Sequence, residues 1–160
     1  MVNNGIKGSV SKAPVLPHSN LAQIFAFHLK AQEAICAELE AIADSLPLSV
    51  NHEKCIQVTL SLLPLIEQAH RFEENQLFPQ LLKIADPHHD LAQTIKRLEA
   101  EHLGDEDFAE ELCSAISNYI ADPDHSKAEN LGWMLHGFFE SERRHIAFER
   151  EYILPLLNKL

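Results

Sequence analysis

The sequence predicts an all-α protein: an up-down-up-down antiparallel four-helix bundle with a short N-terminal arm. Its composition favours helices, because Leu, Ala, Glu and Ile dominate the middle of the chain and only 5 of 160 residues are Gly. Apolar residues recur at intervals of three and four along four long segments, which is typical of amphipathic helices. The breaks between these segments are short and contain Pro47, Pro87 and Pro123. Short connections place consecutive helices side by side and antiparallel.

The bulk composition limits the class of protein. A chain of 160 residues with 46% hydrophobic residues can form one domain with a substantial core, which argues against disorder. The formal net charge of -11 argues against binding to nucleic acid or to an anionic membrane. No stretch approaches the roughly 20 apolar residues of a membrane span, and the start of the chain lacks a secretion signal. We expect a cytoplasmic protein, and three widely spaced cysteines fit such a reducing compartment.

The N-terminal part of the chain divides into an arm and a first helix. Residues 1–17 show no hydrophobic period, so we expect a loose arm there and the bundle over residues 18–160. The first helix is expected from about Asn20 to Ala43, with Ser19 or Asn20 as its N-cap. Its apolar stripe consists of Leu21, Ile24, Phe25, His28, Ile35, Leu39 and Ile42.

Three further helices follow. The second is expected from about His52 to Ile84, kinked at Pro64, with a stripe of Leu62, Leu63, Ile66, His70, Leu77, Phe78 and Leu81. The third is expected from about His88 to Ala121, with a stripe of Leu91, Ile95, Leu98, His102, Glu106, Ala109, Cys113, Ile116 and Ile120. The fourth is expected from about Ser126 to Leu157, with a stripe of Met134, Phe138, His145, Glu149, Ile153 and Leu156.

One histidine lies in the middle of each apolar stripe: His28, His70, His102 and His145. Counting from the helix ends at about 1.5 Å per residue places His70 level with His102, and His102 level with His145. His28 falls within about three residues of the same height. One imidazole from each helix is therefore expected to point inward in a single layer. The other six histidines are near helix ends or on a solvent face, and we expect them at the surface.

Acidic residues accompany three of these histidines at a spacing of four, in the pairs His70/Glu74, His102/Glu106 and His145/Glu149. This spacing puts both side chains on one helix face. Buried imidazoles and carboxylates without partners would be costly, and a bound metal removes that cost. Imidazole and carboxylate are ligands for iron and related metals. We predict a metal site drawn from His28, His70, Glu73, Glu74, His102, Glu106, His145 and Glu149.

Other glutamates leave alternatives open. Glu73 follows His70 by three residues and could serve instead of Glu74 or beside it. Glu67 and Glu142 each precede a stripe histidine by three residues, and either could hydrogen bond to the ligands.

These residues resemble the hemerythrin-like family, the HHE cation-binding domain. The segments that carry the likeness are Phe25–Leu29, HRFEENQLFPQLL at 70–82, RLEAEH at 97–102 and RRHIAFEREYILPLL at 143–157. The likeness covers about residues 20–157. It implies a non-haem di-iron centre, two irons per chain bridged by two carboxylates. By this likeness the four stripe histidines are terminal ligands, Glu149 is one bridge, and Glu74 or Glu73 is the other.

The chain departs from the pattern of the oxygen-carrying hemerythrins. Glu106 stands where the carriers have a second histidine in the third helix, and Arg150 stands where their fourth helix has an aspartate. The stretch from His70 to Pro79 is also one residue shorter than that from His145 to Pro155, which leaves the choice between the two helix-two glutamates open. A carboxylate in place of an imidazole adds negative charge and stabilises ferric iron, which opposes reversible oxygen binding.

We therefore expect a di-iron protein that senses or handles oxygen, nitric oxide or iron, with a diatomic molecule as its candidate ligand. The sequence assigns no catalytic residue and indicates no protein partner. One alternative is a di-iron redox enzyme with peroxidase-like or nitric-oxide-reducing activity. Another is a helical interaction module with a vestigial metal site.

Overall fold

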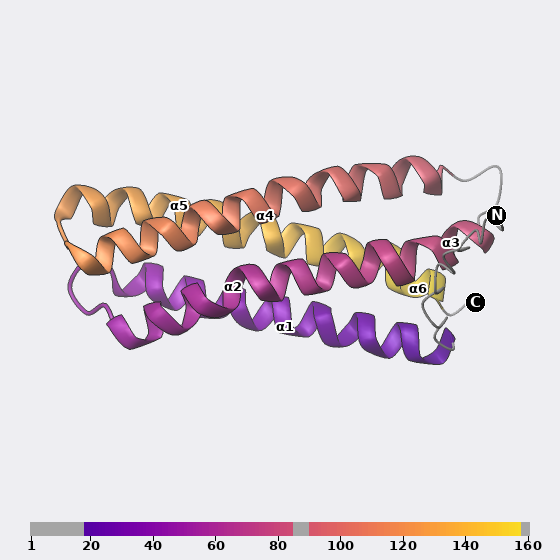
Figure 1. The fold of residues 1–160 in the computed structure, drawn as a ribbon, viewed down its shortest axis with the longest axis horizontal. Coiled ribbons are helices and arrows are strands. Elements are labelled where there is room, and N and C mark those ends of the chain that lie inside the picture. Colours follow the sequence, from indigo (N-terminus) through magenta and orange to yellow (C-terminus); the bar gives the residue numbers. More distant parts are fainter. Residues whose placement is uncertain (1–17, 85–89, 158–160) are drawn as a thin grey trace, which may run out of the picture.

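Four long helices make the body of the molecule. The computed structural model describes residues 18–84 and 90–157, which form helices joined by short turns. The long helices are α1 (His18–Ser45), α2 (His52–Phe72), α4 (Leu91–Ala121) and α5 (His125–Phe148). Figure 1 shows them side by side, with the chain reversing direction at each connection. The prediction of an all-α four-helix bundle is confirmed.

Two of the long helices continue through a short π-helical segment. α2 leads through η1 (Glu73–Leu77) into α3 (Phe78–Ile84). α5 leads through η2 (Glu149–Ile153) into α6 (Leu154–Leu157). Both segments lie at the same end of the bundle in Figure 1, beyond the last turn of α2 and of α5.

The core lies between the four helices, because each packs against two neighbours. α1 and α4 each contact both α2 and α5. The largest fully buried side chains include Phe25, Phe78, Phe138 and Phe139. Burying an aromatic side chain of this size stabilises the folded state by about 1.5–3 kcal/mol. Outside the core, two ion pairs join α1 to α5 and η2. Arg143 of α5 pairs with Glu40, and Arg150 of η2 pairs with Glu33.

The helix boundaries agree closely with those expected. α1 begins at His18, two residues early, so neither Ser19 nor Asn20 precedes the helix as a cap. The second helical stretch spans 52–84 as expected, and Pro64 lies inside α2, where the kink stays a prediction. α4 begins at Leu91, and the expected start at His88 lies outside the described residues, as does the predicted arm over residues 1–17.

Side-chain caps begin two of the helices. Asn51 precedes α2 and its side chain accepts a hydrogen bond from the backbone N–H of Lys54 at 3.0 Å. Asp124 precedes α5 and accepts from the backbone N–H of Lys127 at 2.8 Å. Each cap satisfies a donor that the first turn of a helix leaves without a backbone partner.

Candidate metal centre

Three of the four stripe histidines converge in the core. His70 comes from α2, His102 from α4 and His145 from α5. The rings of His70 and His102 are stacked, with centroids 3.8 Å apart and planes within 6°. The His145 ring centroid lies 5.3 Å from that of His102 and 6.2 Å from that of His70. One ring nitrogen from each of the three histidines lies within 4.8 Å of the other two.

Two fully buried carboxylates join this group. Glu73 Oε2 lies 3.2 Å from His102 Nε2, and Glu149 Oε1 lies 3.4 Å from His145 Nε2. Glu73, His102, His145 and Glu149 each offer a donor atom within 4.8 Å of the others. Both glutamates are 0% exposed. We call the three histidines and two glutamates the inner cluster: His70, Glu73, His102, His145 and Glu149.

Each carboxylate stands at the first residue of a π-helical segment. Glu73 begins η1 and Glu149 begins η2, and each precedes a proline, Pro79 or Pro155, by six residues. A proline has no backbone N–H to donate. The residue before each proline instead donates its N–H five residues back, to the carbonyl of the glutamate. Such wide turns inside helices occur frequently at functional sites.

The two glutamates match when they are counted from the prolines and differ when they are counted from the histidines. Counted from the prolines, Glu73 and Glu149 hold the same position. Counted from the histidines they differ, because Glu73 follows His70 by three residues and Glu149 follows His145 by four. The structure thus turns Glu73 inward and leaves Glu74 39% exposed.

Glu74 and Glu106 contact the outer nitrogens of the histidines. His70 Nδ1 lies 2.9 Å from Glu106 Oε1, and His102 Nδ1 lies 2.8 Å from Glu74 Oε1. The two helices thus exchange partners, since each histidine meets the glutamate of the facing helix. A carboxylate only accepts, so each Nδ1 carries the proton and each Nε2 keeps its lone pair for a metal. Hydrogen bonds of this kind orient metal-binding histidines in proteins.

The outer nitrogen of His145 faces two acidic residues of α4. Its Nδ1 lies 3.5 Å from Glu101 Oε2 and 4.0 Å from Asp105 Oδ2. These separations are ion-pair distances, longer than a good hydrogen bond. All three histidines of the inner cluster therefore have carboxylates behind them.

Burial and neighbouring charges shift the pKa values of the cluster. Burial, with the charges of His102 and His145, lowers the pKa of His70 to about 2. Burial also lowers the pKa of His102, against the opposing hydrogen bond to Glu74. Burial lowers the pKa of His145 too, but the contact with Glu149 and nearby acidic charges outweigh it and raise that pKa to about 9. Two histidines are thus neutral at neutral pH.

Two negative charges on the buried carboxylates of Glu73 and Glu149 would repel each other. Burial and the adjacent Glu149 raise the pKa of Glu73 well above its ordinary value. A cation between the two groups would remove this repulsion and take the place of a shared proton.

The residues present fit a metal. Within the described residues, seven buried atoms of the inner cluster, besides Nδ1 of His145, have no hydrogen-bond partner. They are Nε2 of His70, His102 and His145 and both carboxylate oxygens of Glu73 and Glu149. Buried polar atoms are almost always paired, and these are the donor types of iron and related metals.

His28 lies apart from the inner cluster. Its ring centroid is 5.2 Å from that of Phe72 and 5.8 Å from that of Phe27, and burial lowers its pKa. It is 7% exposed and is not among the donors that fall within 4.8 Å of one another.

Of the eight predicted site residues, the structure therefore brings five together. It sets Glu74 and Glu106 behind the histidine rings and His28 against Phe72. Sequence reasoning missed Glu101 and Asp105, which lie one turn apart on α4. It also missed Gln32, although Gln32 stands four residues after His28 on the apolar stripe.

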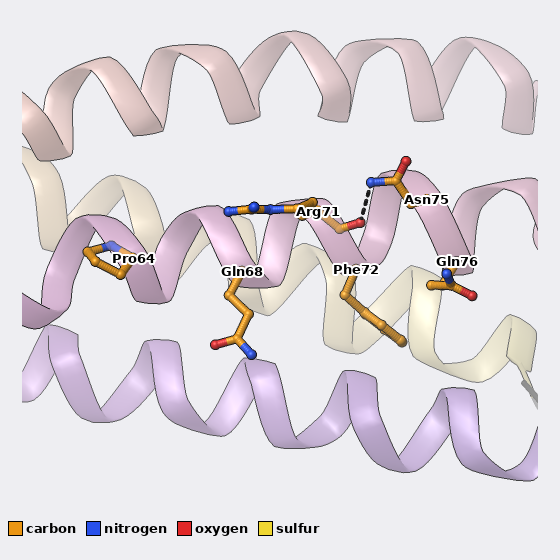
Figure 2. Close-up of a pocket in the computed structure, with 6 residues that line it drawn as sticks. All are labelled: Pro64, Gln68, Arg71, Phe72, Asn75 and Gln76. Atoms are coloured by element: carbon orange, nitrogen blue, oxygen red, sulfur yellow. Dashed lines mark hydrogen bonds between the residues drawn. The ribbon is translucent and has the colours of Figure 1, made fainter. Parts of the chain in front are cut away.

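An open groove lies along α2 and η1. Its volume is about 580 Å³, and its lining residues are Pro64, Gln68, Arg71, Phe72, Asn75 and Gln76. Figure 2 shows the side-chain amide of Asn75, a residue of η1, donating a hydrogen bond to the carbonyl oxygen of Arg71. The two atoms are 2.8 Å apart. No residue of the inner cluster lines this groove, so the groove does not open directly onto the candidate metal ligands.

The bundle and its buried cluster define a helical protein with a site suited to a metal ion. The sequence model of the hemerythrin HHE cation binding domain matches residues 21–157, and the chain belongs to this family. Comparisons with curated proteins and with solved structures gave no match. In the ranges that the structure describes, no helix has the length and apolar character needed to cross a membrane.

Proposed function

We propose that this protein binds iron, two ions per chain, at the inner cluster and uses the centre to sense or handle oxygen, nitric oxide or iron. The observation that supports this most is the set of seven buried, unpartnered donor atoms. In this proposal His70, His102 and His145 bind through Nε2, and the carboxylates of Glu73 and Glu149 bridge the ions. The site has more donors than one ion needs from its protein.

The charge of the donor set argues against an oxygen carrier. Two carboxylates oppose the positive charge of the metal and stabilise ferric iron. Glu106, which stands at the position of a carrier histidine, lies behind His70 at 2.9 Å and adds a negative charge close to the cluster. We infer that these residues would hold iron in a setting that favours the ferric form over reversible binding of oxygen.

The burial of the cluster limits the size of that ligand. None of its five residues is more than 7% exposed, and the groove of Figure 2 is lined by other side chains. Diatomic molecules and metal ions are small enough to enter through side-chain fluctuations, and larger substrates are not.

Metal analysis of anaerobically loaded protein tests the proposal. We expect two irons per chain after loading with ferrous iron, and a charge-transfer absorption of ferric iron after air is admitted. Glu149→Gln should lose at least one of the two ions. Glu151→Gln, an exposed change on the same segment, is the matched control and should keep both.

Other outcomes would point elsewhere. Fewer than one metal per chain in the wild-type protein would overturn the proposal and leave a structural bundle with a vestigial site. Sustained turnover of peroxide or nitric oxide by the loaded protein would instead favour a redox enzyme.

A further inference from the structure

A second buried polar pair lies one helical turn from the inner cluster. The side chain of Gln32 on α1 donates a hydrogen bond from Nε2 to Glu142 Oε1 on α5, at 3.0 Å. Gln32 is 0% exposed and Glu142 is 1% exposed. The pair thus joins two helices far apart in sequence, inside the core.

The pair is not satisfied by its own hydrogen bond. Gln32 Oε1 and Glu142 Oε2 are both buried and have no partner. Buried oxygens such as these normally have a hydrogen-bonding partner, so the amide oxygen of Gln32 and the second carboxyl oxygen of Glu142 each lack one. The pair therefore keeps two hydrogen-bonding positions free inside the core.

Stability alone does not explain the pair. Replacing both members of a buried polar pair by apolar groups of the same shape is often neutral or stabilising. Cys36, one turn further along α1, and Leu135, two turns back along α5, are buried apolar residues that show what the core of these helices accepts. A carboxyl group at this depth is a cost that the fold itself does not require.

The position of Glu142 connects it electrostatically to the cluster. The inner face of α5 and η2 carries three of these polar residues at intervals of three and four: Glu142, His145 and Glu149. Glu142 itself is not one of the converging donors. The charged and titratable groups that act on it are His145, Asp105 and Glu149, and it in turn acts on Glu73 and on Cys36.

We propose, on the basis of the function proposed above, that Glu142 is the proton store of the metal centre and that Gln32 positions its carboxyl group. In the resting state Glu142 is neutral. When a basic molecule or anion arrives at the centre, the O–H bond of Glu142 breaks and the proton moves to that acceptor. The carboxylate that remains keeps the hydrogen bond from Gln32 Nε2, so its charge is partly balanced inside the core.

The electrostatics support a neutral resting form. Burial raises the pKa of Glu142 to about 7, against the opposing charge of His145. The acidic groups Asp105 and Glu149 raise it further, whereas the hydrogen bond from Gln32 lowers it. Such a group gains and loses its proton near neutral pH, where a proton store is useful.

Infrared spectroscopy of the metal-free protein tests the first half of the proposal. The difference between wild type and Glu142→Gln at pH 6 should show the C=O stretch of one neutral carboxyl, which disappears with a midpoint near pH 7. Gln32→Leu should move this midpoint upward, because it removes a donor that favours the carboxylate. Glu140→Gln, an exposed change on the same helix, should give no such difference.

The infrared result can overturn the proposal outright. Absence of a neutral-carboxyl band at pH 6 would do so, as would an unchanged midpoint in Gln32→Leu. Glu142→Gln can still hydrogen bond to Gln32, so this variant should fold, and Gln32→Leu supplies an independent test.

Proton counting during metal loading tests the second half. At pH 6 under anaerobic conditions, ferrous loading of wild type should release the same number of protons per chain as loading of Glu142→Gln, because Glu142 keeps its proton in the resting centre. Release of about one more proton by wild type would overturn the proton store while leaving metal binding intact. If wild type bound no iron, the proposed function would fail, and the infrared result would still decide whether Glu142 holds a proton.

Discussion

Adjacent glutamates of the second helical stretch have opposite environments. Glu73 is fully buried with two unpartnered oxygens, whereas Glu74 is 39% exposed and accepts from the outer nitrogen of His102. The i, i+4 rule favours Glu74 as the partner of His70, but in the structure Glu73, at i+3, is the buried residue. The same reasoning applies to Glu106, which shares a face with His102 but contacts His70 of the facing helix.

Replacing these two glutamates should separate their roles. Glu73→Gln should remove a metal-binding oxygen and abolish binding of at least one iron. Glu74→Gln should weaken metal affinity by about 10- to 100-fold while keeping the stoichiometry, because it loosens the orientation of His102. Titration of both variants with ferrous iron, followed by elemental analysis, measures the difference. Equal losses in the two variants, or a larger loss in Glu74→Gln, would contradict the geometry.

The cysteines should differ in reactivity according to burial. Cys36 is 0% exposed, and burial together with the nearby Glu142 raises the pKa of its thiol to about 12. Because the thiolate is the reactive form, Cys36 should resist alkylation at pH 8 in the folded protein. Cys113, which is only partly buried, should react faster. Mass spectrometry after timed alkylation, with urea-unfolded protein as the control, checks this order; faster labelling of Cys36 would count against the packing.

At the scale of single elements, the two π-helical segments matter most. The amphipathic period predicted helices through both regions, and helices are present. The period does not distinguish the i→i−4 backbone hydrogen bonds of an α-helix from the i→i−5 bonds of a π-helix. The signal that could have found the wide turns is the shared spacing from each inner glutamate to the following proline. That spacing shows that Glu73 corresponds to Glu149, which the spacing from the histidines conceals.

The start of α2 offers a direct test of helix capping. Asn51→Ala should lower the free energy of unfolding by about 1 kcal/mol, because the backbone N–H of Lys54 loses its side-chain acceptor. Asn51→Asp keeps an acceptor and should lose much less. Urea unfolding of the metal-free protein measures both changes. A destabilisation in Asn51→Asp as large as in Asn51→Ala would show that the cap is not the cause.

At the scale of the whole molecule, the polar groups of the inner cluster lower the stability of the folded bundle when no metal is bound. Buried carboxylates and imidazoles from three helices meet where an apolar core would be more stable. A bound metal reverses this, since it adds binding free energy to the folded state, about 2.7 kcal/mol at a hundredfold excess over Kd. The folded protein and its metal should therefore be strongly linked.

The metal-free protein should lose stability as the pH rises from 6.5 to 9. The raised pKa of His145 means that the folded chain keeps a proton that the unfolded chain loses near pH 6.5. The resulting stabilisation is complete below pH 6.5 and is lost as the pH passes about 9. Glu142, with its pKa raised to about 7, acts in the same direction over the range from 4.5 to 7. Below pH 6.5 the lowered pKa values of His70 and His102 oppose both groups.

Urea midpoints of chelator-treated protein across this range measure the effect. With iron bound the trend should reverse, because the metal competes with the proton on His145 and binds more tightly at higher pH. A midpoint that does not change between pH 6.5 and 9 without metal would contradict the environment described for His145.

The sequence by itself determined the helices, their amphipathic faces and the placement of one histidine on each face. These depend on local spacing, which the 3.6-residue period of a helix converts into direction. Only the tertiary structure decided which side chains meet. It turned Glu73 inward, set Glu74 and Glu106 behind the histidines of the facing helices, left His28 beside Phe72, and paired Gln32 with Glu142. Such contacts depend on the rotation of each helix against its neighbours, which no spacing within a single helix records.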